Sequence, residues 1–367
     1  MCTVSGSPDD VSVWSGTPAY LIHALRDLGV EVISMGPLGT RWRRCAEVWS
    51  GLTARAGRRM NWEAEPTLLR LLGRELDRTL PGLEVDAVVT MGWYPIREQV
   101  GSGAPPIFYW GDAPMAERIG RSPYWSGISR RTQHRAVRTE ELALPTLTGV
   151  LMSSEWAVGS MVASGVVDPN QIRCVPFGAN LEDPGVVDRG APRASVSLLT
   201  VGVDWERKGI DRAIAVTEHL RGNGLECHLD VVGVTPPNST WQRPWVTFHG
   251  FVSKKTVEGS HLLDKLYRTA DVFLLPTVYE PFGIVLTEAY AYSLPVVVTD
   301  VDGIPERVSD GGRTVGGSRR VEDFADAVLA ILSRYSDYSD GARSDFVTRG
   351  NWTRSASILL DSIRELA

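Results

Sequence analysis

Short apolar runs alternate with stretches in which apolar residues recur every three or four positions along this chain of 367 residues. Such runs are typical of buried parallel strands, and the longer period is typical of helices that pack on a sheet. In the first half, the pattern predicts strands at residues 30–35, 86–91, 106–110, 149–153 and 172–176, and helices at 17–28, 65–79, 132–143 and 157–163. In the second half, it predicts strands at 197–203, 228–234, 245–249, 272–275, 296–299 and 313–315, and helices at 209–220, 260–269, 283–291, 304–308 and 321–332.

Regular alternation of strand and helix predicts an α/β protein built from doubly wound parallel sheets. The pattern occurs twice, and residues 181–195 between the two halves are rich in Gly, Pro, Asp and Arg. We therefore expect a first Rossmann-like domain at residues 1–184, a linker at 185–195 and a second Rossmann-like domain at 196–351. The domains are expected to face each other across a cleft. Residues 352–367 follow as an amphipathic helix.

Composition narrows the class of protein. A formal charge of −6 argues against general nucleic-acid binding, and 43% hydrophobic with 22% charged residues fits a soluble globular protein. No two of the four cysteines are spaced as a metal or redox motif (Cys2, Cys45, Cys174 and Cys227). The N-terminus lacks a basic region followed by an apolar core, and no apolar run reaches the length of a membrane span. A cytoplasmic location is expected.

The most informative stretch follows the predicted strand at 272–275 and reads YEPFGIVLTEA over residues 279–289. Pro281 is placed where the first turn of a helix tolerates a missing N–H. The amides of Phe282, Gly283 and Ile284 would then form a helix N-terminus, which favours an anion. Glu280 and Glu288 can both face one crevice and accept hydrogen bonds from vicinal hydroxyls. The stretch therefore predicts a binding site for a sugar nucleotide. The alternative is a helix start with solvated glutamates.

Together with residues 294–300 (LPVVVTD) and 303–306 (GIPE), this stretch resembles the Glu-x7-Glu signature of retaining glycosyltransferases of family 4, which have the GT-B fold. The resemblance implies an enzyme that moves a hexose-type sugar from a nucleoside diphosphate sugar to a hydroxyl or other nucleophile of an acceptor, with retention of anomeric configuration. It also implies that the second domain binds the donor, that the first binds the acceptor, and that the last helix crosses back onto the first domain.

A second phosphate-binding element is predicted at residues 202–209 (GVDWERKG), after a strand and at the start of a helix. Arg207 and Lys208 would neutralise the diphosphate, and cations are otherwise disfavoured at a helix N-terminus. We expect these two residues to hold the diphosphate together with the amides of residues 282–284. Glu288 is expected to hold the ribose hydroxyls, and Glu280 is expected to orient the hexose.

The resemblance also implies residues that line the site. Phe251 and Val252 are expected at the nucleotide base, and Gly16 in a loop that approaches the donor. Asp112 follows a strand where many relatives have a histidine, and it is expected to contact the hexose or the acceptor nucleophile; the alternative is a helix cap. The remaining acceptor candidates are Thr17, also a plausible helix N-cap, and two aromatic residues for which local packing is the alternative, Trp93 and Tyr94.

Arginines gather in two places, one of which contains Arg41, Arg43, Arg44, Arg55, Arg58 and Arg59, and the other Arg118, Arg121, Arg130, Arg131, Arg135 and Arg138. They could face an anionic acceptor or the inner face of an anionic membrane, and the alternative is a solvated surface. The acceptor itself could be a small molecule, a lipid-linked molecule or a glycan. We read Asp300 and Asp302 as part of the GT-B pattern rather than as a metal motif, so no metal or other cofactor is expected.

Two other classes of protein are compatible with these residues. A sugar-nucleotide epimerase of the same fold would release an isomerised donor without an acceptor. A non-catalytic protein that binds nucleotide sugars would turn nothing over, although the full set of Arg207, Lys208, Glu280 and Glu288 favours a transferase.

Overall fold

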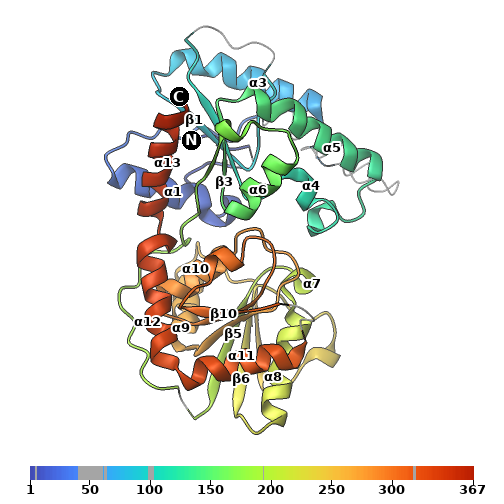
Figure 1. The fold of residues 1–367 in the computed structure, drawn as a ribbon, viewed down its shortest axis with the longest axis vertical. Helices are drawn as coiled ribbons and strands as arrows, with labels where there is room; N and C mark the ends of the chain where they lie inside the picture. The colour runs from blue at the N-terminus through green and yellow to red at the C-terminus, as the bar shows by residue number, and fades with distance from the viewer. Residues whose placement is uncertain (5, 40–60, 62–63, 98–102, 193, 317–319) are drawn as a thin grey trace. The chain divides into compact units, whose positions relative to one another are not determined.

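The computed structural model describes the chain apart from residues 5, 40–60, 62, 63, 98–102, 193 and 317–319. Its contacts divide the chain into unit 1, which comprises Met1–Pro176 and Ser355–Ala367, and unit 2, which comprises Phe177–Arg354. Each unit is a parallel β-sheet with helices on both faces (Figure 1). The predicted linker at 185–195 falls within unit 2, because the guanidinium of Arg189 donates to the carbonyl oxygens of Tyr267 (2.6 Å) and Tyr292 (2.7 Å).

Unit 1 contains a four-stranded sheet in the order β1-β2-β3-β4, with strands Val88–Met91, Ile107–Gly111, Gly149–Met152 and Ile172–Cys174. All four lie within or beside the predicted ranges, because these runs are apolar enough to be covered on both faces. The predicted strand at 30–35 is reduced to one parallel bridge, between Met35 and Cys2. Cys2 also pairs with Thr90 of β1, so the N-terminal residues extend this edge of the sheet.

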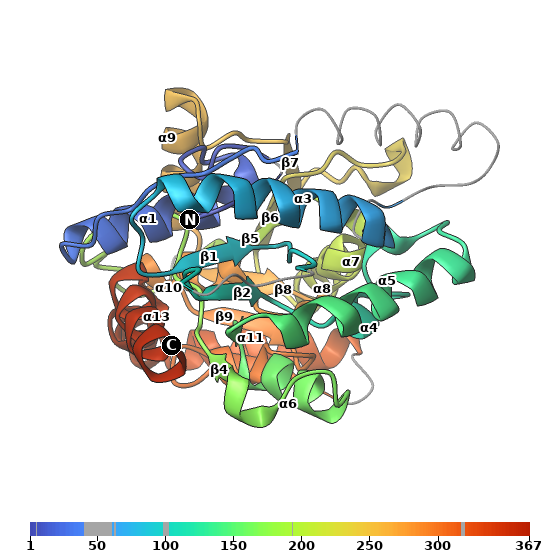
Figure 2. The same ribbon diagram turned by 90° about the horizontal axis from the view of Figure 1, so that it is seen from above.

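The helices of unit 1 cover both faces of its sheet, with α1 and α3 on one side and α6 and the C-terminal part of α13 on the other (Figure 2). Apolar residues of α3 (Leu69, Leu72, Leu76) and α6 (Met161) belong to one core cluster with Ile107 and Tyr109 of β2. The helices are α1 (Thr17–Asp27), α3 (Pro66–Thr79), α4 (Met115–Arg118), α5 (Arg130–Ala143) and α6 (Glu155–Ala163), with short 3-10 turns at Val13–Gly16, Leu80–Gly82, Pro123–Trp125, Leu144–Thr146 and Pro169–Gln171.

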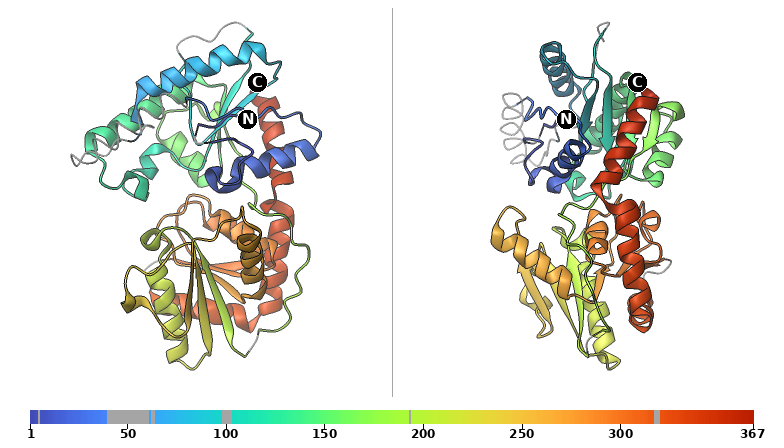
Figure 3. Two further views of the ribbon diagram at one scale, coloured as in Figure 1. Left: turned by 180° about the vertical axis from the view of Figure 1, so that it is seen from behind. Right: turned by 90° about the vertical axis from the view of Figure 1, so that its left-hand side faces the viewer.

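Unit 2 contains a six-stranded parallel sheet in the order β10-β9-β8-β5-β6-β7. Figure 3 shows the ribbon of this unit from two further sides. Alternate residues of its central strands enter two different cores, as a period of two requires. Phe273 and Leu275 of β8 join one cluster, and Val272 and Leu274 join the other. The strands are β5 (Val196–Val201), β6 (Cys227–Val232), β7 (Val246–Gly250), β8 (Val272–Leu275), β9 (Val296–Thr299) and β10 (Gly312–Val315).

Helices α8 and α11 cover one face of this sheet, and α9 and α10 cover the other. The helices of unit 2 are α7 (Trp205–Lys208), α8 (Ile210–Gly222), α9 (Val257–Thr269), α10 (Ile284–Ala291), α11 (Val321–Ser333) and α12 (Tyr335–Asp345), with 3-10 turns at Ser239–Trp241 and Pro305–Arg307 and a π-helical turn at Phe346–Gly350. The pattern of the sequence did not predict α12, and the predicted helix at 304–308 is a single 3-10 turn.

The last helix, α13 (Trp352–Leu366), begins in unit 2 and belongs to unit 1 from Ser355 onward. Leu366 lies against Gly149 of β3, where a Cβ atom on the glycine would come within 2.8 Å of the leucine side chain. Glu365 pairs with Arg173 of β4 at 3.1 Å. The end of the chain is therefore part of the fold of unit 1.

Candidate functional site

The loops at the carboxyl ends of β5 and β8 bring Arg207, Lys208 and Glu280 together in unit 2. Arg207 Nη1 lies 3.0 Å from Glu280 Oε2, and Lys208 Nζ lies 2.5 Å from the same oxygen. Lys208 and Glu280 are both buried. Ligands of doubly wound sheets bind beyond the carboxyl ends of the strands, which is where this cluster lies.

The two loops are joined by hydrogen bonds to the main chain of Arg207, one from a side chain and one from an amide. The carbonyl oxygen of Arg207 accepts from Thr277 Oγ1 (2.7 Å) and from the amide of Val278 (2.9 Å). Between α7 and α8, Gly209 has a φ of 66°, and a Cβ atom there would lie 2.1 Å from the carbonyl oxygen of Pro276. No other residue type fits at this position, so glycine allows the close approach of the two loops.

Charge in this cluster is compensated only in part, because one carboxylate, that of Glu280, faces two cations. Burial alone would raise the pKa of Glu280, but the charges of Lys208 and Arg207 outweigh it and hold the pKa below its ordinary value. Burial lowers the pKa of Lys208, which the carboxylates of Glu280 and Glu288 oppose. Of the two carboxylates that the sequence singled out, Glu280 is the one in contact with the Lys208 ammonium group.

Helix α10 begins close to this cluster, at Ile284, with Gly283 as its N-cap at a φ of 80°. The prediction that Pro281 occupies the first turn is wrong, because a left-handed residue separates the proline from the helix. Phe282 anchors the loop: its buried ring lies 5.2 Å from that of Phe177 and under the guanidinium of Arg307 at 4.8 Å. Amides at the start of a helix have no carbonyl partner in a preceding turn and can bind an anion, although here the amide of Leu286 donates to the carbonyl oxygen of Gly283 at 2.9 Å.

Glu288, one turn into α10, is buried with both carboxylate oxygens engaged. Oε1 accepts from Lys254 Nζ, and Oε2 accepts from the hydroxyl of Tyr267 at 3.1 Å. Burial and the Glu288 carboxylate raise the pKa of Tyr267 well above its ordinary value, so this hydroxyl remains a donor. Lys254 Nζ also donates to the carbonyl oxygen of Asn180 at 2.9 Å. A carboxylate has about four lone-pair positions, so Glu288 can still accept from hydroxyls of a ligand.

The loop after β7 carries the two residues expected at a nucleotide base. The side chain of Phe251 is exposed, at 76%, and Val252 is half-buried against the core cluster that includes Tyr267 and Leu286. Lys254 follows two residues later and reaches Glu288, so this loop is connected to α10.

The candidates in unit 1 lie at the carboxyl ends of β1 and β2 and at the start of α1. Gly16, not Thr17, is the N-cap of α1, and Thr17 is its buried first residue. Three successive residues, Trp14, Ser15 and Gly16, have positive φ angles of 50°, 58° and 94°. Strained backbone of this kind is found at functional sites. Asp112 directly follows β2 and is half-buried.

The expected stacking of Trp93 and Tyr94 on an acceptor requires exposed rings, and the structure buries both. Trp93 donates from its indole nitrogen to the carbonyl oxygen of Cys2 at 3.2 Å, and the ring of Tyr94 lies 5.3 Å from that of Tyr109. Both belong to the core of unit 1, which is the packing alternative that the sequence left open.

The first arginine group, from Arg41 to Arg59, lies outside the described residues. In the second group, Arg121, Arg135 and Arg138 pair with Glu117 (3.1 Å), Glu65 (2.6 Å) and Glu141 (2.6 Å). Arg130 and Arg131 are exposed at the start of α5. Much of this charge is therefore compensated on the protein itself.

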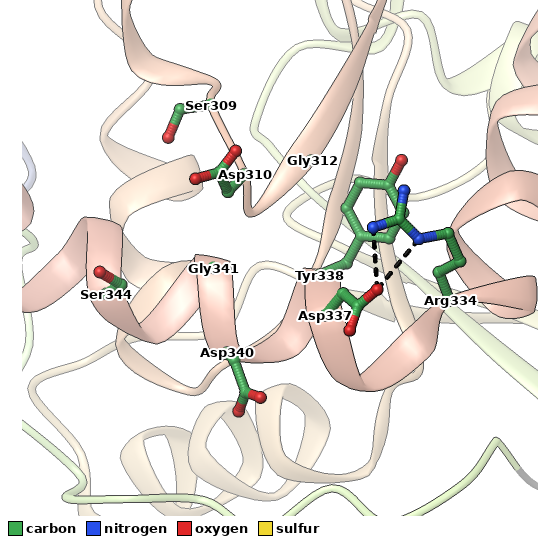
Figure 4. Close-up of a pocket in the computed structure, with 9 residues that line it drawn as sticks. All are labelled: Ser309, Asp310, Gly312, Arg334, Asp337, Tyr338, Asp340, Gly341 and Ser344. Carbon is green, nitrogen blue, oxygen red and sulfur yellow. Dashed lines mark hydrogen bonds and ion pairs between the residues drawn. The ribbon is translucent and has the colours of Figure 1, made fainter.

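A pocket of about 590 Å³ lies elsewhere in unit 2 (Figure 4). Its lining includes three aspartates, Asp310, Asp337 and Asp340, and the ion pair between Arg334 and Asp337. None of the predicted site residues lines it, and an acidic lining does not suit an anionic diphosphate.

Sequence reasoning found Arg207, Lys208, Glu280 and Glu288 but missed Asp204, Lys254, Tyr267 and Asp302, which hold them in place. Asp204 Oδ1 caps α7 at the amide of Arg207 (2.7 Å), and its position before a short helix was a usable signal. Lys254 and Tyr267 are distant in sequence from Glu288 and belong to no motif.

Among the residues that the structure describes, no three His, Cys, Asp or Glu side chains are placed to share a metal ion. In the described part of the chain, every helix is too short or too polar to cross a membrane.

The two-unit architecture is that of the GT-B glycosyltransferases. It resembles the sucrose-phosphate synthase of Thermosynechococcus elongatus with a TM-score of 0.59 at 19% identity, over 82% of this chain and 78% of that one. It also resembles a glycosyltransferase of Rickettsia africae with a TM-score of 0.55 at 14% identity, over 82% of each chain. These likenesses confirm the predicted fold.

Residues 195–334 match the family described as glycosyl transferases group 1, which confirms the resemblance that the sequence indicated. Over 243 residues the chain is 29% identical to the D-inositol 3-phosphate glycosyltransferase of Actinosynnema mirum, which covers 60% of this chain. The chain spans 58% of the length of that curated relative.

Proposed function

We propose that this protein is a glycosyltransferase that moves a hexose-type sugar from a nucleoside diphosphate sugar to a hydroxyl or other nucleophile of an acceptor, with retention of configuration as in family 4. The observation that carries the proposal is the cluster in unit 2, in which Arg207 and Lys208 both contact Glu280. Two cations at the carboxyl end of a parallel sheet, close to the start of α10, suit a diphosphate.

In this proposal Arg207, Lys208 and the amides of Phe282, Gly283 and Ile284 hold the diphosphate. Negative charge grows on the diphosphate as the bond to the sugar breaks, so fixed cations stabilise the transition state more than the bound donor. Glu288 accepts from the ribose hydroxyls, and Glu280 accepts from the hexose.

Retention requires that the acceptor attack the face of the sugar from which the phosphate departs. The bond between the anomeric carbon and the phosphate oxygen breaks, the bond to the acceptor oxygen forms on the same face, and the acceptor's proton passes to the departing phosphate. No protein nucleophile and no metal ion are needed for this scheme. Asp112 is the unit 1 residue that we propose contacts the hexose or the acceptor nucleophile.

Unit 1 is proposed to bind the acceptor, which could be a small molecule, a lipid-linked molecule or a glycan. The exposed Arg130 and Arg131 could attract an anionic acceptor or the inner surface of an anionic membrane. This proposal fits a protein of the cytoplasm that contacts the membrane peripherally.

The test is thermal unfolding of the parent, of Glu288→Ala and of Glu322→Ala with UDP, GDP, ADP and dTDP. Glu322 is an exposed residue of α11 and serves as the control. A ligand at about 100 times its dissociation constant should stabilise a protein by roughly 2.7 kcal/mol. We expect one diphosphate to stabilise the parent and the control, but not Glu288→Ala. If no diphosphate stabilises the parent, the proposal is wrong.

Turnover separates the transferase from its alternatives. Consumption of a nucleotide sugar that rises with an added acceptor supports the transferase. Release of an isomeric nucleotide sugar without an acceptor would instead identify an epimerase, and binding without any turnover would identify a sensor.

A further inference from the structure

Asp302 occupies an unusual backbone position in the loop that follows β9. It lies in the turn from Val301 to Ile304, which is closed by a hydrogen bond from the amide of Ile304 to the carbonyl oxygen of Val301 at 3.0 Å. Asp302 has a φ of 52°, in the left-handed region that favours glycine. Aspartate and asparagine are the side chains that tolerate this region best, so the turn itself does not require a carboxylate.

The Asp302 carboxylate reaches the proposed donor site. Its Oδ2 accepts a hydrogen bond from the amide of Glu280 at 2.9 Å, across 22 positions of sequence. The carboxylate of Glu280 contacts Arg207 and Lys208. Asp302 therefore holds the main chain of Glu280, and the two cations hold its side chain. The turn is firmly placed, because its flanking residues Val301 and Ile304 are buried.

A hydrogen bond from an amide to an ionised carboxylate is stronger than one between neutral groups. Asp302 therefore limits rotation of the peptide from which the Glu280 side chain extends. The carbonyl oxygen of the same peptide, that of Tyr279, accepts from Arg207 Nη1 at 3.1 Å and from Thr277 Oγ1 at 3.2 Å. Asp302 supplies the hydrogen bond on the amide side of this peptide.

We propose that Asp302 is a positioning residue that sets the direction of Glu280 toward the sugar of the donor. The inference rests on the proposed function, in which Glu280 contacts the hexose. The nucleoside diphosphate part of the donor is held by other residues, so its binding should not depend on Asp302.

The test compares the parent with Asp302→Gly, Asp302→Asn and a control, Asp300→Asn, which changes an exposed residue of the same loop. Glycine relieves the backbone but removes the hydrogen bond, whereas asparagine keeps an oxygen that can accept it. Two measurements are the melting temperature and the dissociation constant of the nucleoside diphosphate that stabilises the parent. The third is the turnover number for hydrolysis of the corresponding nucleoside diphosphate glucose in the absence of an acceptor.

We expect Asp302→Gly to lower kcat about tenfold or more, as the loss of one charge-assisted hydrogen bond implies. Nucleoside diphosphate affinity should stay within about twofold and the melting temperature should not fall, because glycine suits the turn. Asp302→Asn should retain most of the turnover, and Asp300→Asn should match the parent.

Three results would overturn the inference while leaving the proposed function in place. They are unchanged kcat in Asp302→Gly, an equal loss of kcat and nucleotide affinity in that variant, and turnover in Asp302→Asn as low as in Asp302→Gly. Failure of the parent to bind any nucleoside diphosphate would overturn both proposals.

Discussion

Replacement of Glu280 by glutamine tests the charge balance of the site. The change keeps the size of the side chain and one oxygen acceptor but removes the negative charge that both Arg207 and Lys208 contact. Lys208 is 5% exposed, so its ammonium group would be left near a second cation with little access to water. We therefore expect Glu280→Gln to be folded but less stable than the parent.

The magnitude follows from burial. Removal of one partner from a fully buried ion pair destabilises a protein by about 3–5 kcal/mol. Here the side chain of Arg207 is 20% exposed, and glutamine can still accept a hydrogen bond, so we expect about 2 kcal/mol at pH 7. For a unit of this size that corresponds to a fall of about 4–8 °C in melting temperature.

The difference should depend on pH in one direction. The pKa of Glu280 is lowered from 4.5, because Lys208 and Arg207 outweigh the effect of burial. A carboxylate with a lowered pKa stabilises the folded state above its unfolded pKa, and this stabilisation is lost as the pH falls through the folded pKa. Parent and variant should thus differ most at neutral pH and converge below pH 4.5.

The assay is thermal and denaturant unfolding at pH 7 and at several values below pH 4.5, with Glu322→Gln as an exposed control. The same variant should bind nucleoside diphosphates at least as tightly as the parent, since two cations lose their internal partner, while turnover of the nucleotide sugar falls. Equal stability of parent and variant at pH 7, or a difference that persists unchanged in acid, would refute this account of the cluster.

Three other predictions concern neighbouring groups. Lys254→Met should destabilise the protein by about 2 kcal/mol in denaturant unfolding, because the buried Glu288 loses its cation, whereas exposed Lys265→Met should not. Phe251→Ala should leave the melting temperature unchanged but weaken nucleoside diphosphate binding by isothermal titration; equal affinity would exclude it from the base site. Turnover should survive EDTA, and a loss that added Mg²⁺ or Mn²⁺ restores would contradict the metal-independent scheme.

Much of the fold could be predicted from apolar runs and their spacing. Strand β8 was predicted at its observed bounds, because four consecutive apolar residues are typical of a parallel strand that is buried on both faces of its sheet. Helix α12 was missed because its sequence, YSDYSDGARSD, is mostly polar. It is buried only at Tyr335, Ala342 and a few small or polar residues, so its place depends on tertiary contacts that no local pattern records.

The residues of the candidate site likewise fall into those that the sequence could predict and those that it could not. Glu280, Glu288, Arg207 and Lys208 could be found because chemistry and spacing coincide within short segments. Trp93 illustrates the limit, since an aromatic residue after a strand looks the same in sequence whether its ring is buried or exposed. Lys254 and Asp302 act through contacts made across 34 and 22 positions, which only the folded chain brings together.

The contribution of α13 to unit 1 has a consequence for biosynthesis. Proteins emerge from the ribosome with the N-terminus first, and N-terminal domains generally fold before the rest. Unit 1 cannot follow that order, because Ser355–Ala367 complete it. In the sequence, unit 2 lies wholly between the two parts of unit 1. Unit 2 can therefore fold completely while unit 1 still lacks the helix that lies against β3 and β4. Unit 1, most of which is translated first, is then the unit that completes its fold last.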